Sequence, residues 1–290
     1  MRFSTPIDVA HGVALDSVSC ASPTSCLALD ASGRAYTFNG KSWSAPTPPA
    51  PQTIGAGSIS VSCASPTLCM AIPNAADQVV SFNGQTFSAP VTLPGADNLE
   101  AVGCAPSGYC AAIDAEGNAF SYNGQWQGTI GAWGSASSIS CVSSTFCMAA
   151  SGGIAHWDGV RWTKPDPFGT TSSFTGVSCP SASFCTAVDV TGYALQWNGQ
   201  TFSTPVPIEP ASKPSTGTLG PAPSGVSCPS ASFCAAVDSQ GGALQWSGGH
   251  WTRTIIDPGH RLTSVSCPTQ TFCMAVDQSG DALVGRAAPS

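Results

Sequence analysis

The sequence predicts an all-β protein, a single seven-bladed β-propeller with four-stranded blades and one disulfide within each blade. Three observations predict this fold: a cysteine pair repeated at near-constant spacing, a strand pattern shared by the repeats, and a last repeat that the start of the chain completes. Only 9% of the 290 residues are charged, and the chain holds 31 glycines and 24 prolines, which suits many short strands joined by turns.

Every cysteine belongs to a Cys-x5-Cys pair, and together the pairs use all 14 cysteines. The pairs are Cys20-Cys26, Cys63-Cys69, Cys104-Cys110, Cys141-Cys147, Cys179-Cys185, Cys228-Cys234 and Cys267-Cys273. The first cysteines of successive pairs lie 37 to 49 residues apart, and a period near 40 is typical of propellers and solenoids. Each unit is too small to bury its own core, so we expect the units to stack into one domain that covers residues 1–290.

Thiols in strict pairs with none left over indicate disulfides formed in an oxidising space, which predicts a secreted, extracellular protein. Structural zinc sites normally leave about two to four residues between ligands and add a second pair of ligands, whereas five residues intervene here and the chain has four histidines. We therefore expect no metal and no cofactor. No signal peptide precedes Arg2-Phe3-Ser4, so we expect the export segment to lie outside this chain.

Each repeat reads as four short strands, named a to d from the axis outward. Strand a carries Val or Ile two places before the first cysteine, with Ser or Gly between them, so the small residue faces away from the other two. Strand b carries Ala two places after the second cysteine in every repeat. Small residues at both places suit strands that crowd near a propeller axis.

Turn residues separate the strands. Five repeats have Asp-x-x-Gly between strands b and c, where the Asp side chain can cap the turn and Gly can take a positive φ. A calcium site is the alternative for these aspartates, but one carboxylate per turn supplies too few oxygens. Four repeats have Asn-Gly between strands c and d, which is typical of hairpins.

The last repeat lacks strand d, and the missing strand is found at the start of the chain. Phe3-Ser4-Thr5-Pro6-Ile7 matches Phe202-Ser203-Thr204-Pro205-Val206 almost residue for residue. We therefore predict that residues 1–10 form the outer strand of the last blade and close the ring, which removes an exposed sheet edge. Segment 207–224, rich in Pro, Ser and Gly, is predicted to be a long inter-blade loop.

Two phrases give the chain a family resemblance. Ser264-Val265-Ser266-Cys267-Pro268 and the Trp-Asn-Gly-x-x-Phe-Ser-x-Pro run at 197–205 resemble the propeller-forming repeats of secreted bacterial proteins. The resemblance covers essentially the whole chain and implies the propeller fold. Propellers of this look include lectins and targeting modules fused to secreted enzymes or toxins, which implies carbohydrate binding, but no ligand residue can be transferred by position.

Several function classes are disfavoured. The chain has no nucleophile elbow, zinc-protease helix, phosphate loop or dinucleotide fingerprint. Its net charge is −7 and its Lys and Arg residues are scattered, so we expect no nucleic-acid partner. No apolar run approaches the roughly 20 residues of a membrane span.

The leading hypothesis is a non-enzymatic extracellular module that binds a glycan or cell-surface polysaccharide at several weak sites.

Aromatic pairs flank the c–d turns and are the main candidates for binding. Aromatics stack well across a hairpin, and the sequence leaves two uses open for them: packing between blades, or stacking on sugar rings beside polar strand-c residues. The candidate ligand-binding residues are Trp133, His156, Trp157, Arg161, Gln196, Trp197, Gln245 and Trp246.

Two other functions stay open. A polysaccharide lyase or glycosidase would have its site at the mouth of the central channel, where Glu100 lies on a predicted inner strand and His156 is a second candidate; a glycosidase needs a pair of carboxylates. A rigid platform for a protein partner, or for a fused module, is the other alternative. Fold alone does not choose among these functions.

Overall fold

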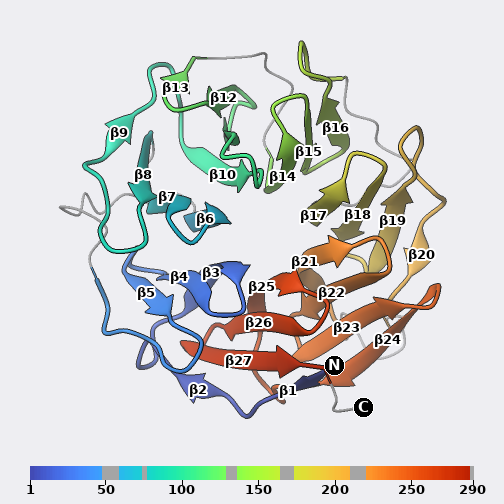
Figure 1. The fold of residues 1–290 in the computed structure, drawn as a ribbon. Coiled ribbons are helices and arrows are strands. Elements are labelled where there is room, and N and C mark those ends of the chain that lie inside the picture. Colours follow the sequence, from blue (N-terminus) through green and yellow to red (C-terminus); the bar gives the residue numbers. More distant parts are fainter. Residues whose placement is uncertain (48–58, 74–76, 129–135, 164–172, 210–219, 288–290) are drawn as a thin grey trace.

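The protein forms a ring of seven antiparallel sheets around a central axis (Figure 1). The structure is a computed structural model that describes residues 1–47, 59–73, 77–128, 136–163, 173–209 and 220–287. All regular elements among these residues are strands. The predicted all-β, seven-bladed fold is therefore confirmed, with three or four main strands in a blade.

The strands follow the repeat. The first blade has β3 (Leu15–Ser22), β4 (Ser25–Asp30) and β5 (Ala35–Phe38). The second has β6 (Ile59–Ser65), β7 (Leu68–Pro73), β8 (Gln78–Phe82) and β9 (Val91–Thr92). The third has β10 (Leu99–Cys104), β11 (Cys110–Asp114), β12 (Ala119–Tyr122) and β13 (Trp126–Gln127). The fourth has β14 (Ser138–Ser143), β15 (Phe146–Ala150) and β16 (Ile154–Trp157).

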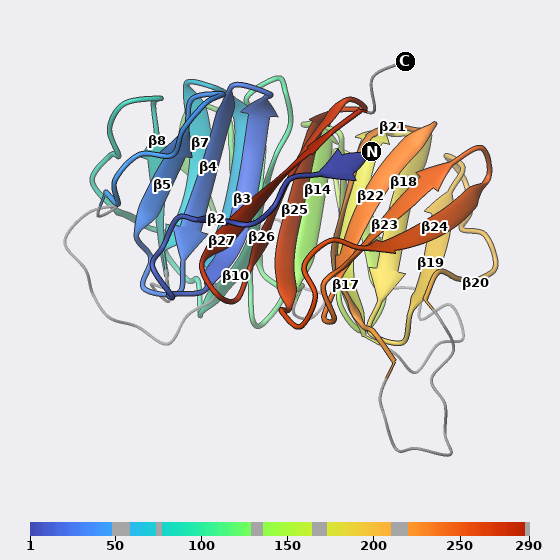
Figure 2. The ribbon, with the colours of Figure 1, turned by 90° about the horizontal axis from the view of Figure 1, so that it is seen from below.

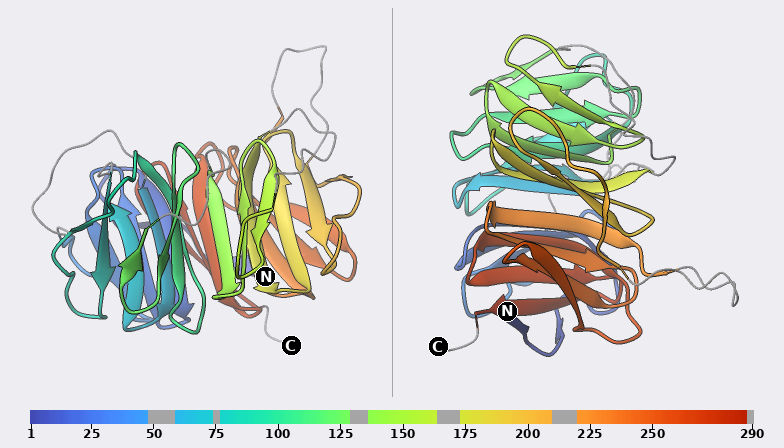
Figure 3. Two further views of the ribbon diagram at one scale, coloured as in Figure 1. Left: turned by 90° about the horizontal axis from the view of Figure 1, so that it is seen from above. Right: turned by 90° about the vertical axis from the view of Figure 1, so that its right-hand side faces the viewer.

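The remaining blades complete the circle. The fifth has β17 (Phe174–Ser181), β18 (Phe184–Asp189), β19 (Tyr193–Trp197) and β20 (Val206–Pro207). The sixth has β21 (Pro223–Ser230), β22 (Phe233–Asp238), β23 (Gly242–Ser247) and β24 (His250–Ile255). The seventh has β25 (Leu262–Thr269), β26 (Phe272–Asp277) and β27 (Asp281–Arg286), together with β1 (Arg2–Phe3) and β2 (Ile7–Asp8). Seen edge-on, the blades form a disc whose inner strands run across its thickness (Figures 2 and 3).

The seventh blade joins the two ends of the chain. Arg2 pairs with Arg286 and Ile7 pairs with Ala282, both in antiparallel register. This confirms the predicted ring closure by an N-terminal strand. The predicted loop 207–224 differs at its ends, because Pro207 belongs to β20 and Pro223 begins β21; residues 210–219 lie outside the described residues. The assignment of residues 1–290 to one domain stays a prediction.

All seven predicted disulfides are present, one in each blade. Each links strands a and b at the end of their hairpin, with the two Cα atoms 3.9 to 4.1 Å apart. The strand-b alanines, predicted to occupy a tight position, are all fully buried: Ala28, Ala71, Ala112, Ala149, Ala187, Ala236 and Ala275.

The core consists of apolar clusters between neighbouring blades rather than within them. Phe38 of the first blade packs on Phe272 of the seventh, with ring centroids 6.4 Å apart. Trp197 of the fifth blade lies in one cluster with Met148 of the fourth. Each of the seven clusters spans one junction in this way. A blade therefore buries its apolar faces only when both neighbours are present, as expected for a repeat protein.

Serine hydroxyls join the inner strands around the ring. The small residue just before the first cysteine of a blade accepts a hydrogen bond from the amide of the first cysteine in the next blade. The donor–acceptor distances are 2.9 to 3.0 Å at six junctions. The accepting residues are Ser19, Ser62, Ser140, Ser178, Ser227 and Ser266. At the seventh junction, between the third and fourth blades, the equivalent residue is Gly103.

The neighbouring blade leaves no room for a side chain at Gly103. A Cβ at this position would lie 2.7 Å from the carbonyl oxygen of Ile139. We expect Gly103→Ala to lower the free energy of unfolding by about 1–3 kcal/mol, as overpacking does, measured by urea denaturation. Gly225→Ala is the control, because it is also on an inner strand and its Cβ would meet nothing within 4 Å. Equal effects of the two substitutions would contradict this interpretation.

Candidate functional site

A groove of about 550 Å³ lies between the sixth and seventh blades. Phe3 and Pro6 belong to the side of the groove that the N-terminal segment supplies. Leu244 and Ile255, on β23 and β24, belong to the other side. The lining is mainly apolar, and its polar residues are Arg2, Ser4, Thr5, Gln245, Thr252 and Thr254. Its volume is within the range of about 300–1,000 Å³ that is typical of ligand pockets.

The groove owes its shape to β24. In the sixth blade a Gly248-Gly249 turn, with both glycines at positive φ, leads into a strand that pairs without a break from Ser247↔His250 to Gly242↔Ile255. The outer strands of the other blades with the Phe-Ser-x-Pro pattern are two residues long or reduced to isolated bridges. Proline has no amide to give to a ladder, and residues 250–256 contain none. The outer strand of the sixth blade is therefore continuous.

Two sheet edges border this groove. The strand order places β24 at the outer edge of the sixth blade and β1 at that of the seventh, and no described strand pairs with the far side of either. Figure 1 shows β1 beside the end of β24. An edge strand presents alternate amide and carbonyl groups that can pair with another chain. Ile255, at the end of β24, is 46% exposed.

The predicted polar position on strand c faces the next blade. The ring of His156, on β16, lies 5.6 Å from that of Trp197 in the fifth blade, centroid to centroid, and burial lowers the pKa of His156. Gln245 accepts a hydrogen bond of 2.8 Å from the amino group of Met1. Ser81 lines a second groove of about 370 Å³ together with Tyr122 and Trp126. Of the candidates that the structure describes, His156 and Trp197 of adjacent blades are thus brought together, and the others do not gather with them into one site.

Two of the candidate tryptophans are packed in the blade junctions. Trp157 is 6% exposed and Trp197 is 9% exposed. Their indole N–H groups donate to the carbonyls of Ser144 and Ala182, at 2.9 and 3.0 Å. This is the packing alternative for the aromatic pairs, and it leaves little ring surface for a sugar. Sugar binding by these residues stays a prediction.

The other candidates lie apart from one another. Trp246 is half-buried and faces Trp251 across the hairpin, with centroids 5.9 Å apart. Arg161 projects into solvent 3.9 Å from Asp158. The amide nitrogen of the Gln196 side chain is buried without a hydrogen bond. Trp133 lies outside the described residues.

The central channel contains two carboxylates. Glu100 and Asp16 occupy the same strand-a position in the third and first blades, and both line an axial hollow of about 240 Å³. Burial raises the pKa of each. The placement of Glu100 at the channel agrees with the sequence prediction. Asp16 was missed, although its place two residues before Val18 is the signal that would have found it.

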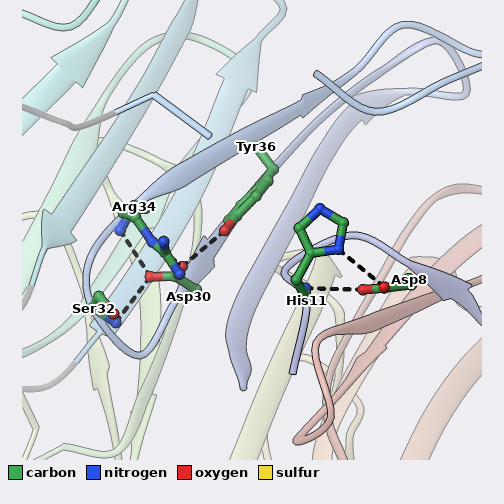
Figure 4. Close-up of polar contacts among 6 residues, drawn as sticks. All are labelled: Asp8, His11, Asp30, Ser32, Arg34 and Tyr36. Atoms are coloured by element: carbon green, nitrogen blue, oxygen red, sulfur yellow. Dashed lines mark hydrogen bonds and ion pairs between the residues drawn. The ribbon is translucent and has the colours of Figure 1, made fainter. Parts of the chain in front are cut away.

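The turn aspartates are buried caps, as predicted. Asp30 is fully buried, and its Oδ1 accepts hydrogen bonds of 2.9 Å from the amides of Ser32 and Arg34 (Figure 4). Its Oδ2 lies 2.7 Å from Nε of Arg34 and accepts a 2.9 Å bond from Tyr36. Burial, followed by this bond, raises the pKa of Tyr36 to about 12. Figure 4 also shows an exposed pair, His11 and Asp8, whose facing atoms are 3.0 Å apart.

A second buried carboxylate joins the turn in the sixth blade. Nε of Arg253 lies 2.8 Å from Oδ2 of Asp238 and 3.0 Å from Oε2 of Glu209. The side chains of Glu209 and Asp238 are 2% and 0% exposed. Burial, followed by the charge of Asp238, raises the pKa of Glu209 to about 8.

Sequence comparison places the chain in no family: no family model matches it, and no curated protein matches it. Solved structures share its fold. YCF48 bound to D1 peptide aligns with a TM-score of 0.73 at 11% identity, over 99% of this chain and 98% of that one. A catalytically inactive virginiamycin B lyase from Staphylococcus aureus with quinupristin aligns at 0.78 and 10%, over 99% and 100%. U3-55K aligns at 0.78 and 10%, over 98% of each chain. Likenesses at this level of identity establish the propeller fold alone.

Proposed function

We propose that this protein is a non-enzymatic extracellular binding propeller that holds an extended polypeptide segment in the groove between its sixth and seventh blades. The observation that carries the proposal is β24, a six-residue outer strand whose outer edge pairs with no described strand and lies beside an apolar groove of about 550 Å³. The extracellular setting rests on the seven disulfides, which form and persist in oxidising spaces.

The groove suits a peptide that adds to the sheet as a further strand. Main-chain hydrogen bonds to the edge of β24 would supply affinity, and every second side chain would enter the groove. The apolar lining from Phe3, Phe233 and Ile256 favours large apolar or β-branched side chains at those positions. Peptide binding is supported by YCF48, a structure with the same fold that was solved bound to D1 peptide.

A selection from a random peptide library tests the proposal. We expect the recovered peptides to alternate apolar and polar residues and to lack proline in the paired stretch. Thr254→Arg places a long charged side chain in the groove without changing the core and should weaken binding at least tenfold, measured by fluorescence anisotropy with a selected peptide. Thr92→Arg, on the exposed outer strand β9 of the second blade, is the matched control and should bind as the unaltered protein does. Equal affinities for the two variants would contradict the proposal.

Carbohydrate binding is the second candidate, and the Trp246–Trp251 pair favours it. Both rings are half-buried at the hairpin of β23 and β24, and exposed indole faces stack on sugar rings. A glycan array on the same protein, repeated with Trp246→Ala, separates the two candidates. Glycan signal lost in this variant, together with an empty peptide selection, would move the function to sugars.

A further inference from the structure

Two buried carboxylates and an imidazole meet at the junction of the sixth and seventh blades. Asp257 is 2% exposed and Asp277 is 0% exposed. Nδ1 of His260 lies 3.0 Å from Oδ1 of Asp257 and 4.0 Å from Oδ2 of Asp277. One ligand atom from each of the three residues lies within 4.8 Å of the other two. The Oδ2 atoms of both aspartates are buried without a hydrogen-bond partner, although buried carboxylate oxygens are normally paired.

The other blades show which group usually donates a hydrogen bond to Oδ2 of the turn aspartate. In each turn aspartate, Oδ1 accepts backbone amides, and Oδ2 is left for another donor. That donor is Arg34 Nε in the first blade, Asn118 Nδ2 in the third and Arg253 Nε in the sixth, at 2.7 to 2.9 Å. In the fifth blade the neighbouring connection lies outside the described residues. Asp277 of the seventh blade has the same turn, with Oδ1 bonded to the amides of Ser279 and Asp281, but no such donor.

The preceding junction is the closest comparison, because it also has a second carboxylate. The amides of Ile208 and Glu209 donate to the carbonyl of Gly192, and those of Ile256 and Asp257 donate to that of Gly241. Glu209 and Asp257 therefore hold equivalent positions.

At the Glu209 position, the guanidinium of Arg253 lies between the two carboxylates. In the seventh blade Ile7 pairs with Ala282, as Thr254 pairs with Ala243 in the sixth. Ile7 is therefore equivalent to Thr254, and the residue before it, Pro6, is equivalent to Arg253. No arginine therefore stands at this position in the next junction, where the imidazole of His260 faces the two carboxylates instead.

We propose that a divalent transition-metal ion, with Zn²⁺ as the best match, binds between Asp257, Asp277 and His260 and takes the place of the guanidinium. Imidazole with carboxylates suits zinc and its neighbours, whereas calcium and magnesium sites use oxygen ligands. Tetrahedral zinc at 2.0–2.2 Å from its ligands places them about 3.4 Å apart, so the observed separations need only small side-chain movements. Water would complete the coordination.

The site is reachable from solvent through His260, whose side chain is 46% exposed. The sequence predicts no metal, because its thiols are paired and each turn supplies a single carboxylate. The second carboxylate and the imidazole come from the connection of the preceding blade, which only the fold places beside the turn.

Zinc titration of the untagged protein after EDTA dialysis tests the inference. Isothermal calorimetry and native mass spectrometry should show one Zn²⁺ per chain, and the midpoint of thermal unfolding should rise with zinc. His260→Gln should weaken zinc binding by more than about 100-fold, beyond the 10–100-fold typical of losing a hydrogen-bond partner of a ligand. Circular dichroism should show that this half-exposed substitution leaves the fold intact.

His11→Gln is the matched control. His11 and Asp8 have the same spacing along the chain and the same 3.0 Å contact as His260 and Asp257, but they are exposed, and among the described residues they belong to no cluster of three potential ligands. The zinc affinity of the His11→Gln variant should equal that of the unaltered protein. Absence of stoichiometric zinc, or equal loss in both histidine variants, would overturn the site and mean that the two carboxylates share a proton instead. Neither readout involves the proposed peptide, so the two proposals fail independently.

Discussion

Reduction of the disulfides should unfold this protein at neutral pH without denaturant. Each disulfide joins residues six positions apart, and the chain-entropy model gives about 2 kcal/mol for a loop of this size. The seven together would contribute about 14 kcal/mol, which is comparable to the whole stability of about 5–15 kcal/mol of a typical domain. Small residues alternate with apolar ones on the inner strands, as Ser17 and Ser19 do with buried Val18 on β3, so these strands bury less apolar surface than fully apolar strands would.

Tryptophan fluorescence and circular dichroism, with and without a phosphine reductant, measure this effect. The paired substitution of Cys20 and Cys26 by alanine is the graded control and should cost only about 2 kcal/mol in urea denaturation. A reduced protein that kept a cooperative unfolding transition near the original midpoint would show that the packing between blades suffices. The extracellular assignment would then lose its main physical support.

Arg253→Leu should destabilise the protein by about 3–5 kcal/mol near neutral pH, as removal of one partner from a buried ion pair does. The guanidinium of Arg253 is the group that lies between Glu209 and Asp238, and the side chains of both acids are buried. Arg34→Leu is a useful comparison, because the carboxylate of Asp30 keeps its hydrogen bond from Tyr36, and among the described residues Arg34 forms its ion pair with Asp30 and not with two acids. We expect the smaller loss there.

The same cluster should make stability depend on pH. The pKa of Glu209 is raised from 4.5 to about 8 in the folded protein, so the folded state binds more protons than the unfolded state between these values. The free energy of unfolding must therefore fall as pH rises from about 4.5 to about 8, by an amount on the order of a few kcal/mol. Urea denaturation across this range measures the slope. Glu209→Gln should flatten it, whereas Glu116→Gln, on the surface, should leave it unchanged; a steep slope in Glu209→Gln would assign the effect to another group.

The fold could be predicted from sequence because its determinants repeat within one chain. The cysteine spacing marks the hairpin of strands a and b, and the match of residues 3–7 with 202–206 reveals the shared blade. The turn aspartates could also be predicted as caps, since Asp30 bonds amides only two and four residues away. These contacts are local or repeated, so a pattern recognised in one repeat predicts the same structure in the others.

Contacts between blades could not be predicted in the same way. Alternation shows that Ser19 faces away from Cys20, but only the rotation between blades brings its hydroxyl 2.9 Å from the amide of Cys63. The partner of Asp238 likewise includes Glu209 from the preceding blade. The burial of Trp157 and Trp197 follows from the neighbouring blade as well, so sequence alone overstated their availability to a ligand. The continuous strand β24 does have a signal in the sequence, because residues 250–256 contain no proline.

The serine hydrogen bonds between inner strands are unevenly distributed around the ring, so one junction between blades is weaker than the others. In the first blade, Ser17 and Ser19 accept hydrogen bonds from the amides of Val61 and Cys63 in the second blade. Their equivalents in the third blade, Ala101 and Gly103, have no hydroxyl, so the junction of the third and fourth blades lacks these two hydrogen bonds. Heat or mechanical load would separate the molecule there first. The product would be a single crescent that starts at the fourth blade, passes through the blade built from both chain ends, and finishes at the third.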